Sequence, residues 1–200
     1  GILTKITAAE KQGLDRDETW DEVFQMLAAK NPLPAICGRV CPHPCETECN
    51  RNEVDAPASI NNVERFVGDW AIEHDLKFKA PEVKYDESVA VIGSGPAGLS
   101  TAYHLALKGY KVTIYEAFPK AGGMLRYGIP AYRLPREIID QEVQRIVDLG
   151  VTLKLNTAVG KDISLADLRA QNKAVFVGIG AHKGRLLGVP GEEAEGMWTG

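Results

Sequence analysis

A glycine-rich turn at Gly93–Gly98 (GSGPAG) constrains the fold of this chain more than any other feature. The turn fits the pattern G-x-G-x-x-G, follows the apolar run Val89–Ile92 and opens a helical pattern that reaches about Lys108. A second strand, Lys111–Tyr115, comes next and ends on the acidic residue Glu116. An isolated match is weak evidence, but strand, turn, helix, strand and acid in this order are typical of a dinucleotide-binding βαβ unit.

Each part of this unit has a physical role in holding a dinucleotide. Gly93 permits the tight turn, Gly95 lets backbone N–H groups approach a pyrophosphate, and Gly98 lets the helix pack close to the strand. The pyrophosphate would lie at the positive end of the helix dipole, and Glu116 would accept hydrogen bonds from ribose hydroxyls. The alternative is a tight strand–turn–helix with no ligand and an exposed acid, but the complete context favours a dinucleotide.

The sequence changes character near residue 79 and predicts two parts. Two helical segments separated by Gly13 are predicted within residues 4–30, and another helix is predicted from about Ala56-Pro57. Later residues predict a helix at 136–149, a strand at 152–155, a helix at 165–170 and a strand at 174–178. We expect a small all-α domain at 1–78, a linker at 79–87, and a truncated α/β Rossmann-like domain at 88–200.

Charge and hydropathy exclude two classes of partner. The net charge of −4 argues against a nucleic-acid partner, which normally requires a basic surface. No apolar run approaches the roughly 20 residues that a membrane span needs. Charged residues also interrupt the N-terminal stretch before it could act as a signal peptide, so we expect a reducing, cytoplasmic setting.

The four cysteines form one group with C-x3-C-x3-C-x3-C spacing, and they are Cys37, Cys41, Cys45 and Cys49. Pro42 and Pro44 would break a helix here and place the thiols on a loop. A disulfide framework is disfavoured in a reducing compartment. A four-cysteine zinc site is an alternative, although structural zinc sites favour C-x2-C pairs. The pattern favours an iron–sulfur cluster, with His43 as an exposed loop residue or a further ligand.

Two further glycine motifs favour FAD over NAD(P) as the dinucleotide. Residues 116–124 (EAFPKAGGM) resemble the E-x-x-x-x-x-G-G-x extension of flavoprotein reductases with two dinucleotide folds. Residues 175–181 (VFVGIGA) resemble the second strand motif of the same class, but have Gly-Ile-Gly-Ala where Ala-Thr-Gly is common. The alternative for Gly122-Gly123 is an ordinary loop.

The motifs taken in order resemble one family along nearly the whole chain. The run ICGRVCP at 36–42, then Cys45-Glu46, Cys49 and the FAD-type fingerprint are similar to the small (β) subunit of NADPH-dependent glutamate synthase. They are also similar to the N-terminal half of dihydropyrimidine dehydrogenase. The segments MLRYGIP at 124–130, YRLP at 132–135 and GVPGE at 188–192 strengthen the resemblance.

The resemblance implies a set of FAD contacts, namely Gly93, Gly95, Pro96, Ala97, Gly98, Glu116, Gly123, Met124, Leu125, Arg133 and Val159. The turn residues would contact the pyrophosphate, Glu116 the ribose and Val159 the adenine. Gly123, Met124, Leu125 and Arg133 would lie toward the flavin. The alternatives are a surface charge for Arg133 and ordinary core positions for Met124 and Val159.

The resemblance also implies two [4Fe-4S] clusters that share ligands between this cysteine group and an earlier one. The candidate metal ligands in this chain are Cys37, Cys41, Cys45, Cys49 and Glu64. Cys41 and Cys45 would serve one cluster and Cys49 the other, whereas Cys37 has no assigned cluster. Glu64 stands where the family has an unusual oxygen ligand; the alternative is a solvated helix carboxylate.

The implied function is an electron relay from NAD(P)H through FAD and [4Fe-4S] clusters to a larger catalytic subunit or a ferredoxin-like acceptor. NAD(P)H would bind through a domain outside these residues, and this stretch alone is expected to be inactive. We expect no catalytic side chain, because hydride transfer to a flavin needs positioning and the cofactor carries the chemistry. The alternative function is a non-catalytic, zinc-binding interaction module.

Overall fold

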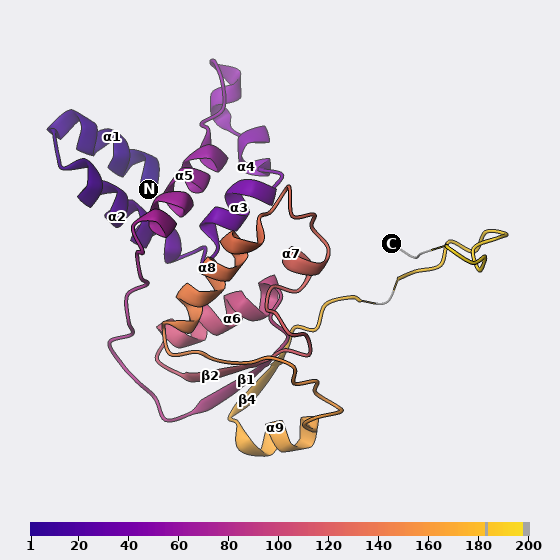
Figure 1. Cartoon of the computed structure of the whole chain (residues 1–200). Coiled ribbons are helices and arrows are strands. Elements are labelled where there is room, and N and C mark those ends of the chain that lie inside the picture. Colours follow the sequence, from indigo (N-terminus) through magenta and orange to yellow (C-terminus); the bar gives the residue numbers. More distant parts are fainter. Residues whose placement is uncertain (183, 198–200) are drawn as a thin grey trace.

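The computed structural model describes residues 1–182 and 184–197 of the chain, with a helical part followed by an α/β part (Figure 1). The helical part contains α1 (Ile2–Gln12), α2 (Arg16–Ala28), α3 (Pro34–Val40), α4 (Pro44–Thr47), a 3-10 turn (Asn50–Glu53) and α5 (Ile60–Glu73). Gly13 ends α1 with a left-handed backbone, and the Asp15 side chain caps α2 by accepting the N–H of Glu18. The break predicted at Gly13 is confirmed.

The α/β part is built on a parallel sheet with strand order β3-β2-β1-β4. Its elements are β1 (Ser88–Ile92), α6 (Pro96–Leu107), β2 (Lys111–Tyr115), α7 (Met124–Tyr127), α8 (Arg136–Val147), β3 (Thr152–Lys154), α9 (Leu165–Gln171) and β4 (Ala174–Val177). The predicted βαβ unit is confirmed, because β1 and β2 pair in parallel with α6 between them in sequence. The short helix α7 was not predicted.

Helices cover both faces of the sheet. Figure 1 shows α6 and α8 between the sheet and the helical part, whereas α9 lies on the opposite face. Alternation along β1 explains this layering: Val91 belongs to the large core under α6 and α8, and its neighbours Ala90 and Ile92 pack with Leu168 of α9. The carboxyl ends of β1, β2 and β4 therefore meet at one edge, where ligands bind in open α/β sheets.

The helical and α/β parts share one continuous hydrophobic core. Phe24 of α2 and Val67 of α5 belong to the same buried cluster as Tyr103 of α6 and Ile146 of α8. The Tyr103 hydroxyl donates a 2.7 Å hydrogen bond to the carbonyl of Ala28, at the end of α2. The two parts are thus joined by buried side chains as well as by residues 74–87, which connect them in sequence.

Two expectations about the cysteine region were wrong. The thiols do not all lie on a loop, because Cys37 lies within α3 and Cys45 within α4. Pro34 and Pro44 each occupy the first turn of a short helix, where a missing N–H costs nothing, so proline starts these helices. The next helix begins at Ile60, four residues later than the expected start at Ala56, and residues 54–59 form an irregular connection.

Candidate functional site

A cleft of about 460 Å³ opens at the carboxyl edge of the sheet, where β1, β2 and β4 end. Among the predicted FAD contacts, Gly93, Gly95, Pro96, Ala97, Glu116, Gly123, Met124 and Val159 line this cleft. The cleft is also lined by Ser94, Phe118, Thr157 and His182, which were not among the predicted contacts. The structure therefore brings together residues separated by more than sixty positions in sequence.

Three predicted residues do not line the cleft. Gly98 packs the first turn of α6 against the β1 turn, because a Cβ there would lie 1.9 Å from the carbonyl oxygen of Gly93. Leu125 is buried in the core, and Arg133 is exposed. Gly98 thus has the close-packing role predicted for it, whereas contact of Leu125 and Arg133 with a flavin stays a prediction.

The backbone of the turn is arranged for close approach of a ligand. Gly95 is the N-cap residue of α6 and has an extended backbone. The first N–H groups of α6 have no acceptor within the helix, and they point out of its N-terminal end toward the cleft. Gly95 and Gly123 lie opposite each other, because a Cβ on Gly123 would come within 2.7 Å of the Gly95 Cα. Side chains at these glycines would fill the space that a pyrophosphate needs.

Glu116 is held rigidly at the end of β2. It is buried, and its carboxylate accepts hydrogen bonds from the Ser94 N–H at 2.8 Å, from the Ser94 hydroxyl, and from the Phe118 N–H at 2.9 Å. A carboxylate offers about four acceptor positions, so one position at Oε1 is left for a ribose hydroxyl. Glu116 therefore fits its predicted role and also fixes the turn.

Ser94 joins the glycine turn to the connection between β2 and α7, and both of these segments line the cleft. Its side chain is fully buried, its N–H and hydroxyl donate to Glu116, and its carbonyl accepts the Gly122 N–H at 3.0 Å. Sequence reasoning missed Ser94 because it occupies a variable position of G-x-G-x-x-G. The residues that line the cleft fit the adenosine diphosphate half of FAD.

We expect Ser94→Ala to destabilise the protein, because it removes a buried hydroxyl that donates to an ionised acceptor. Hydrogen bonds to charged groups contribute roughly 1.5–3 kcal/mol, so the free energy of unfolding in urea should fall by about that amount. Ser100→Ala, on α6, is the matched control and should change it by less than about 0.5 kcal/mol. Equal stability of the two variants would contradict the role given to Ser94.

The cysteines do not complete a cluster within the described residues. Over residues 1–182 and 184–197, no three His, Cys, Asp or Glu side chains are grouped to hold one metal ion. Cys45 is exposed, and Cys37, Cys41 and Cys49 are half-buried. A [4Fe-4S] cluster needs four ligands, so these side chains do not fit a cluster held by this segment alone.

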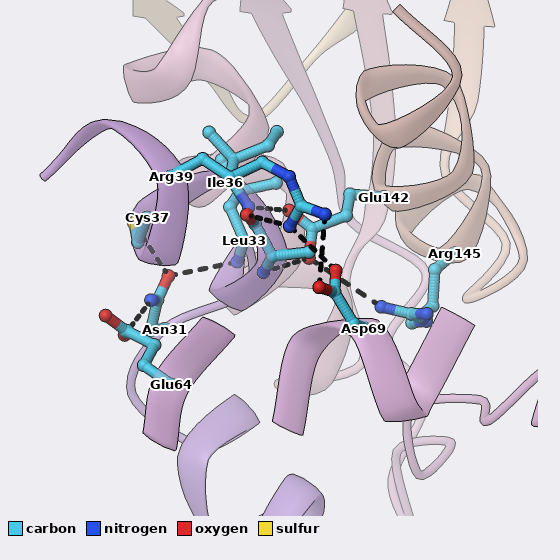
Figure 2. A network of polar contacts seen from close by, with 10 residues as sticks. Asn31, Leu33, Ile36, Cys37, Arg39, Glu64, Asp69, Glu142 and Arg145 are labelled. Carbon is cyan, nitrogen blue, oxygen red and sulfur yellow. Dashed lines mark hydrogen bonds and ion pairs between the residues drawn. The ribbon is translucent and has the colours of Figure 1, made fainter. Parts of the chain in front are cut away.

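Cys37 differs from the other thiols in its surroundings (Figure 2). Its sulfur lies 3.7 Å from Oδ1 of Asn31, whose amide donates a 2.7 Å hydrogen bond to Glu64. Burial raises the pKa of Cys37 to about 11, and burial also raises the pKa of Glu64. Cys49 is the opposite case, because backbone N–H groups of Ala58 and Arg51 lower its pKa. The two predicted ligands Cys37 and Glu64 are thus linked through Asn31.

These differences predict an order of alkylation in protein freed of metal. At pH 8 a thiol with a pKa of about 11 is only about 0.1% ionised, and the thiolate is the nucleophile, so Cys37 should react slowest with iodoacetamide. Cys49 and exposed Cys45 should react much faster. Mass spectrometry of peptides from timed samples measures the rates, and the denatured chain, in which the four rates should converge, is the control. Alkylation of Cys37 as fast as Cys45 would contradict the structure.

No helix within the described residues is both long enough and apolar enough to cross a membrane.

Two family models match successive parts of the chain. Residues 14–76 match the model described as dihydropyrimidine dehydrogenase domain II, 4Fe-4S cluster. Residues 88–150 match the model described as FAD dependent oxidoreductase. The first match contains the cysteine group, and the second contains the glycine turn and Glu116. The cofactors expected from the sequence, FAD and [4Fe-4S], are therefore those of the matching domain families.

Curated relatives match most of this chain. It is 42% identical over 181 residues to the NADPH-Fe(3+) oxidoreductase subunit beta of Geobacter sulfurreducens. This match covers 89% of this chain and 27% of the relative. It is 43% identical over 165 residues to the NAD-dependent dihydropyrimidine dehydrogenase subunit PreT of Escherichia coli, covering 82% of this chain and 40% of the relative. The glutamate synthase [NADPH] small chain of Escherichia coli is 37% identical over 181 residues, and the match covers 89% of this chain and 38% of the relative.

A solved structure has a similar fold over about half of this chain. Mycobacterium tuberculosis FprA in complex with NADPH superposes with a TM-score of 0.50 at 23% identity, over 55% of this chain and 26% of FprA. The chain spans between about a quarter and two fifths of the length of the curated relatives described above. By these matches the chain is homologous to the glutamate synthase small chain, PreT and the NADPH-Fe(3+) oxidoreductase subunit beta, and it joins a part similar to a 4Fe-4S domain to a part similar to a FAD dependent oxidoreductase domain.

Proposed function

We propose that this chain is the FAD-binding and cysteine-bearing part of an NAD(P)H-dependent oxidoreductase that passes electrons to a partner. The observation that carries the proposal is the cleft at the carboxyl edge of the sheet, where the glycine turn, Glu116 and Gly123 converge. In the bound state FAD would supply hydride acceptance and release of single electrons. The chain's own residues would orient it.

We assign separate tasks to the residues of the cleft. The turn from Gly93 to Ala97 would hold the pyrophosphate with backbone N–H groups, and Glu116 would accept a ribose hydroxyl. Val159, which lines the cleft beside Thr157, would contact the adenine. Gly123 and Met124 would lie toward the flavin, and the half-exposed Met124 leaves that end open to solvent or to a further domain.

We also propose that the cysteine segment supplies part of a shared ligand set. Cys41, Cys45 and Cys49 would bind iron together with ligands from outside the described residues, because the thiols of this segment do not form a closed set. Cys37, which is hydrogen-bonded to Asn31, would have a structural role. NAD(P)H binding and the electron acceptor, a larger catalytic subunit or a ferredoxin-like protein, would also belong to parts outside this chain.

The experiment that tests this function is an anaerobic titration of the intact protein with NADPH and with NADH. We expect the visible absorption band of bound flavin to bleach on addition of one of them, followed by reduction of an added electron acceptor. Metal analysis should find iron and acid-labile sulfide. A colourless protein that contains stoichiometric zinc and does not oxidise either nucleotide would contradict the proposal and favour the interaction module.

A further inference from the structure

A carboxylate from the α/β part lies at the start of the cysteine-bearing helix α3. Glu142 of α8 is fully buried, and its two oxygens accept the N–H groups of Ala35 at 2.9 Å and Ile36 at 3.1 Å. Figure 2 shows Glu142 beside the α3 turn, with Arg145 of α8 next to it. These hydrogen bonds join residues more than one hundred positions apart, so they connect the two parts of the chain.

These two hydrogen bonds satisfy the open N–H groups at the start of α3. The first helical residue is Pro34, which has no N–H, and the residue at the N-cap position is Leu33, whose side chain has no acceptor. The Cys37 N–H already bonds to the carbonyl of Leu33. Ala35 and Ile36 therefore depend on Glu142 for the acceptor that a local cap normally supplies.

N–H donors and charged groups around Glu142 partly offset the cost of burying its carboxyl group. Arg145 lies 3.9 Å from it, and the Arg145 guanidinium in turn packs against the rings of Phe24 and Phe78. Burial raises the pKa of Glu142 to about 8. The hydrogen bond from the Ala35 N–H, the charge of Arg145 and the hydrogen bond from the Ile36 N–H oppose that rise. Arg39 of α3 is held by Asp69 of α5 through two hydrogen bonds.

We propose that Glu142 is a positioning residue that fixes α3, and with it Cys37 and Cys41, against the FAD-binding part through its two hydrogen bonds. Cys37 lies in the middle of α3, and Cys41 directly follows the last residue of α3. A shift of this helix would move the thiols relative to the cleft. The inference rests on the proposed function for its purpose, but the contact itself can be tested without measuring activity.

The test compares three substitutions in the intact protein by hydrogen exchange. Glu142→Gln keeps an acceptor oxygen, Glu142→Met keeps most of the volume without an acceptor, and Glu137→Gln alters an exposed glutamate on the same helix as a control. We expect Glu142→Met to speed exchange of the α3 amides by roughly 5- to 150-fold, the range expected for loss of a buried hydrogen-bond acceptor. Glu142→Gln should restore protection at one of the two amides only, because its NH2 group cannot accept the second N–H, and Glu137→Gln should not alter the protection.

A second measurement separates positioning from general loss of stability. Alkylation of Cys37 should accelerate in Glu142→Met, whereas exchange of the α1 amides should stay at the wild-type rate. Equal α3 protection in Glu142→Met and wild type would overturn the proposal, because packing alone would then hold the helix. Failure of the proposed function would appear differently, as wild-type protein without flavin or iron and with α3 still protected.

Discussion

Replacing Gly98 with alanine is expected to abolish retention of FAD and to destabilise the fold. The new Cβ would lie 1.9 Å from the Gly93 carbonyl oxygen and 3.3 Å from Val91, so α6 must move away from β1. Overpacking of this kind costs about 1–3 kcal/mol and more when backbone has to shift. The shift would displace the helix end and the turn that together line the cleft. Flavin content after purification and urea unfolding measure the two effects.

Gly95→Ala is the matched substitution that separates these effects. Gly95 has a φ of −72°, which alanine adopts freely, and the nearest atom to its Cβ is the Gly123 Cα at 3.9 Å. The fold should therefore keep its stability, whereas the methyl group would occupy the space proposed for the pyrophosphate, and FAD should be lost. Retention of FAD by both variants, or unfolding of Gly95→Ala, would contradict this account of the turn.

Replacing Gly68 with alanine is the second change for which we expect a large effect. In an exposed helix this substitution stabilises by up to about 1 kcal/mol. Here the substitution should destabilise the protein, because a Cβ at Gly68 of α5 would lie 2.3 Å from the backbone N of Ala35 of α3. Gly38 of α3 faces Arg65 of α5 in the same way, at 2.4 Å from its Cα. The two helices cross with their backbones in contact at both glycines.

We expect Gly68→Ala to lower the free energy of unfolding by about 1–3 kcal/mol, since the crossing has no flexible side chain that could yield. Separation of α3 from α5 should also raise hydrogen exchange at Ala35 and Ile36. Chemical unfolding measures the first effect, with Glu73→Ala, at an exposed position of α5, as the control. Wild-type stability of Gly68→Ala would show that the helices are not in backbone contact.

The dinucleotide unit could be predicted from sequence because its determinants are local. Turn glycines, an apolar strand and a following acid lie within one short stretch, and the structure places β1, α6 and β2 within one residue of the predicted bounds. The same local reasoning failed at the cysteines. Pro44 was taken as a helix breaker, although it lies in the first turn of α4, where proline is tolerated.

Other features depend on contacts that no local pattern encodes. Ser94 fills a variable position in the motif, and its importance comes from Glu116 and Gly122, which lie in the connection between β2 and α7. Glu142 fits the helical pattern of α8, but the reason for its burial is visible only in the fold, where its carboxylate accepts two N–H groups of α3. Sequence spacing predicted the residues that we propose bind the cofactors, whereas the residues that hold them in place required the folded structure.

The central claim is that the cleft at the carboxyl edge of the sheet holds the adenosine diphosphate half of FAD. Equilibrium binding of FAD and of FMN to flavin-free intact protein, followed by flavin fluorescence, tests it most directly, because FMN lacks the adenosine half. We predict that FAD binds, that FMN does not compete, and that Gly95→Ala loses FAD binding while remaining folded. Equal binding of FMN and FAD, or FAD binding unchanged in Gly95→Ala, would contradict the claim.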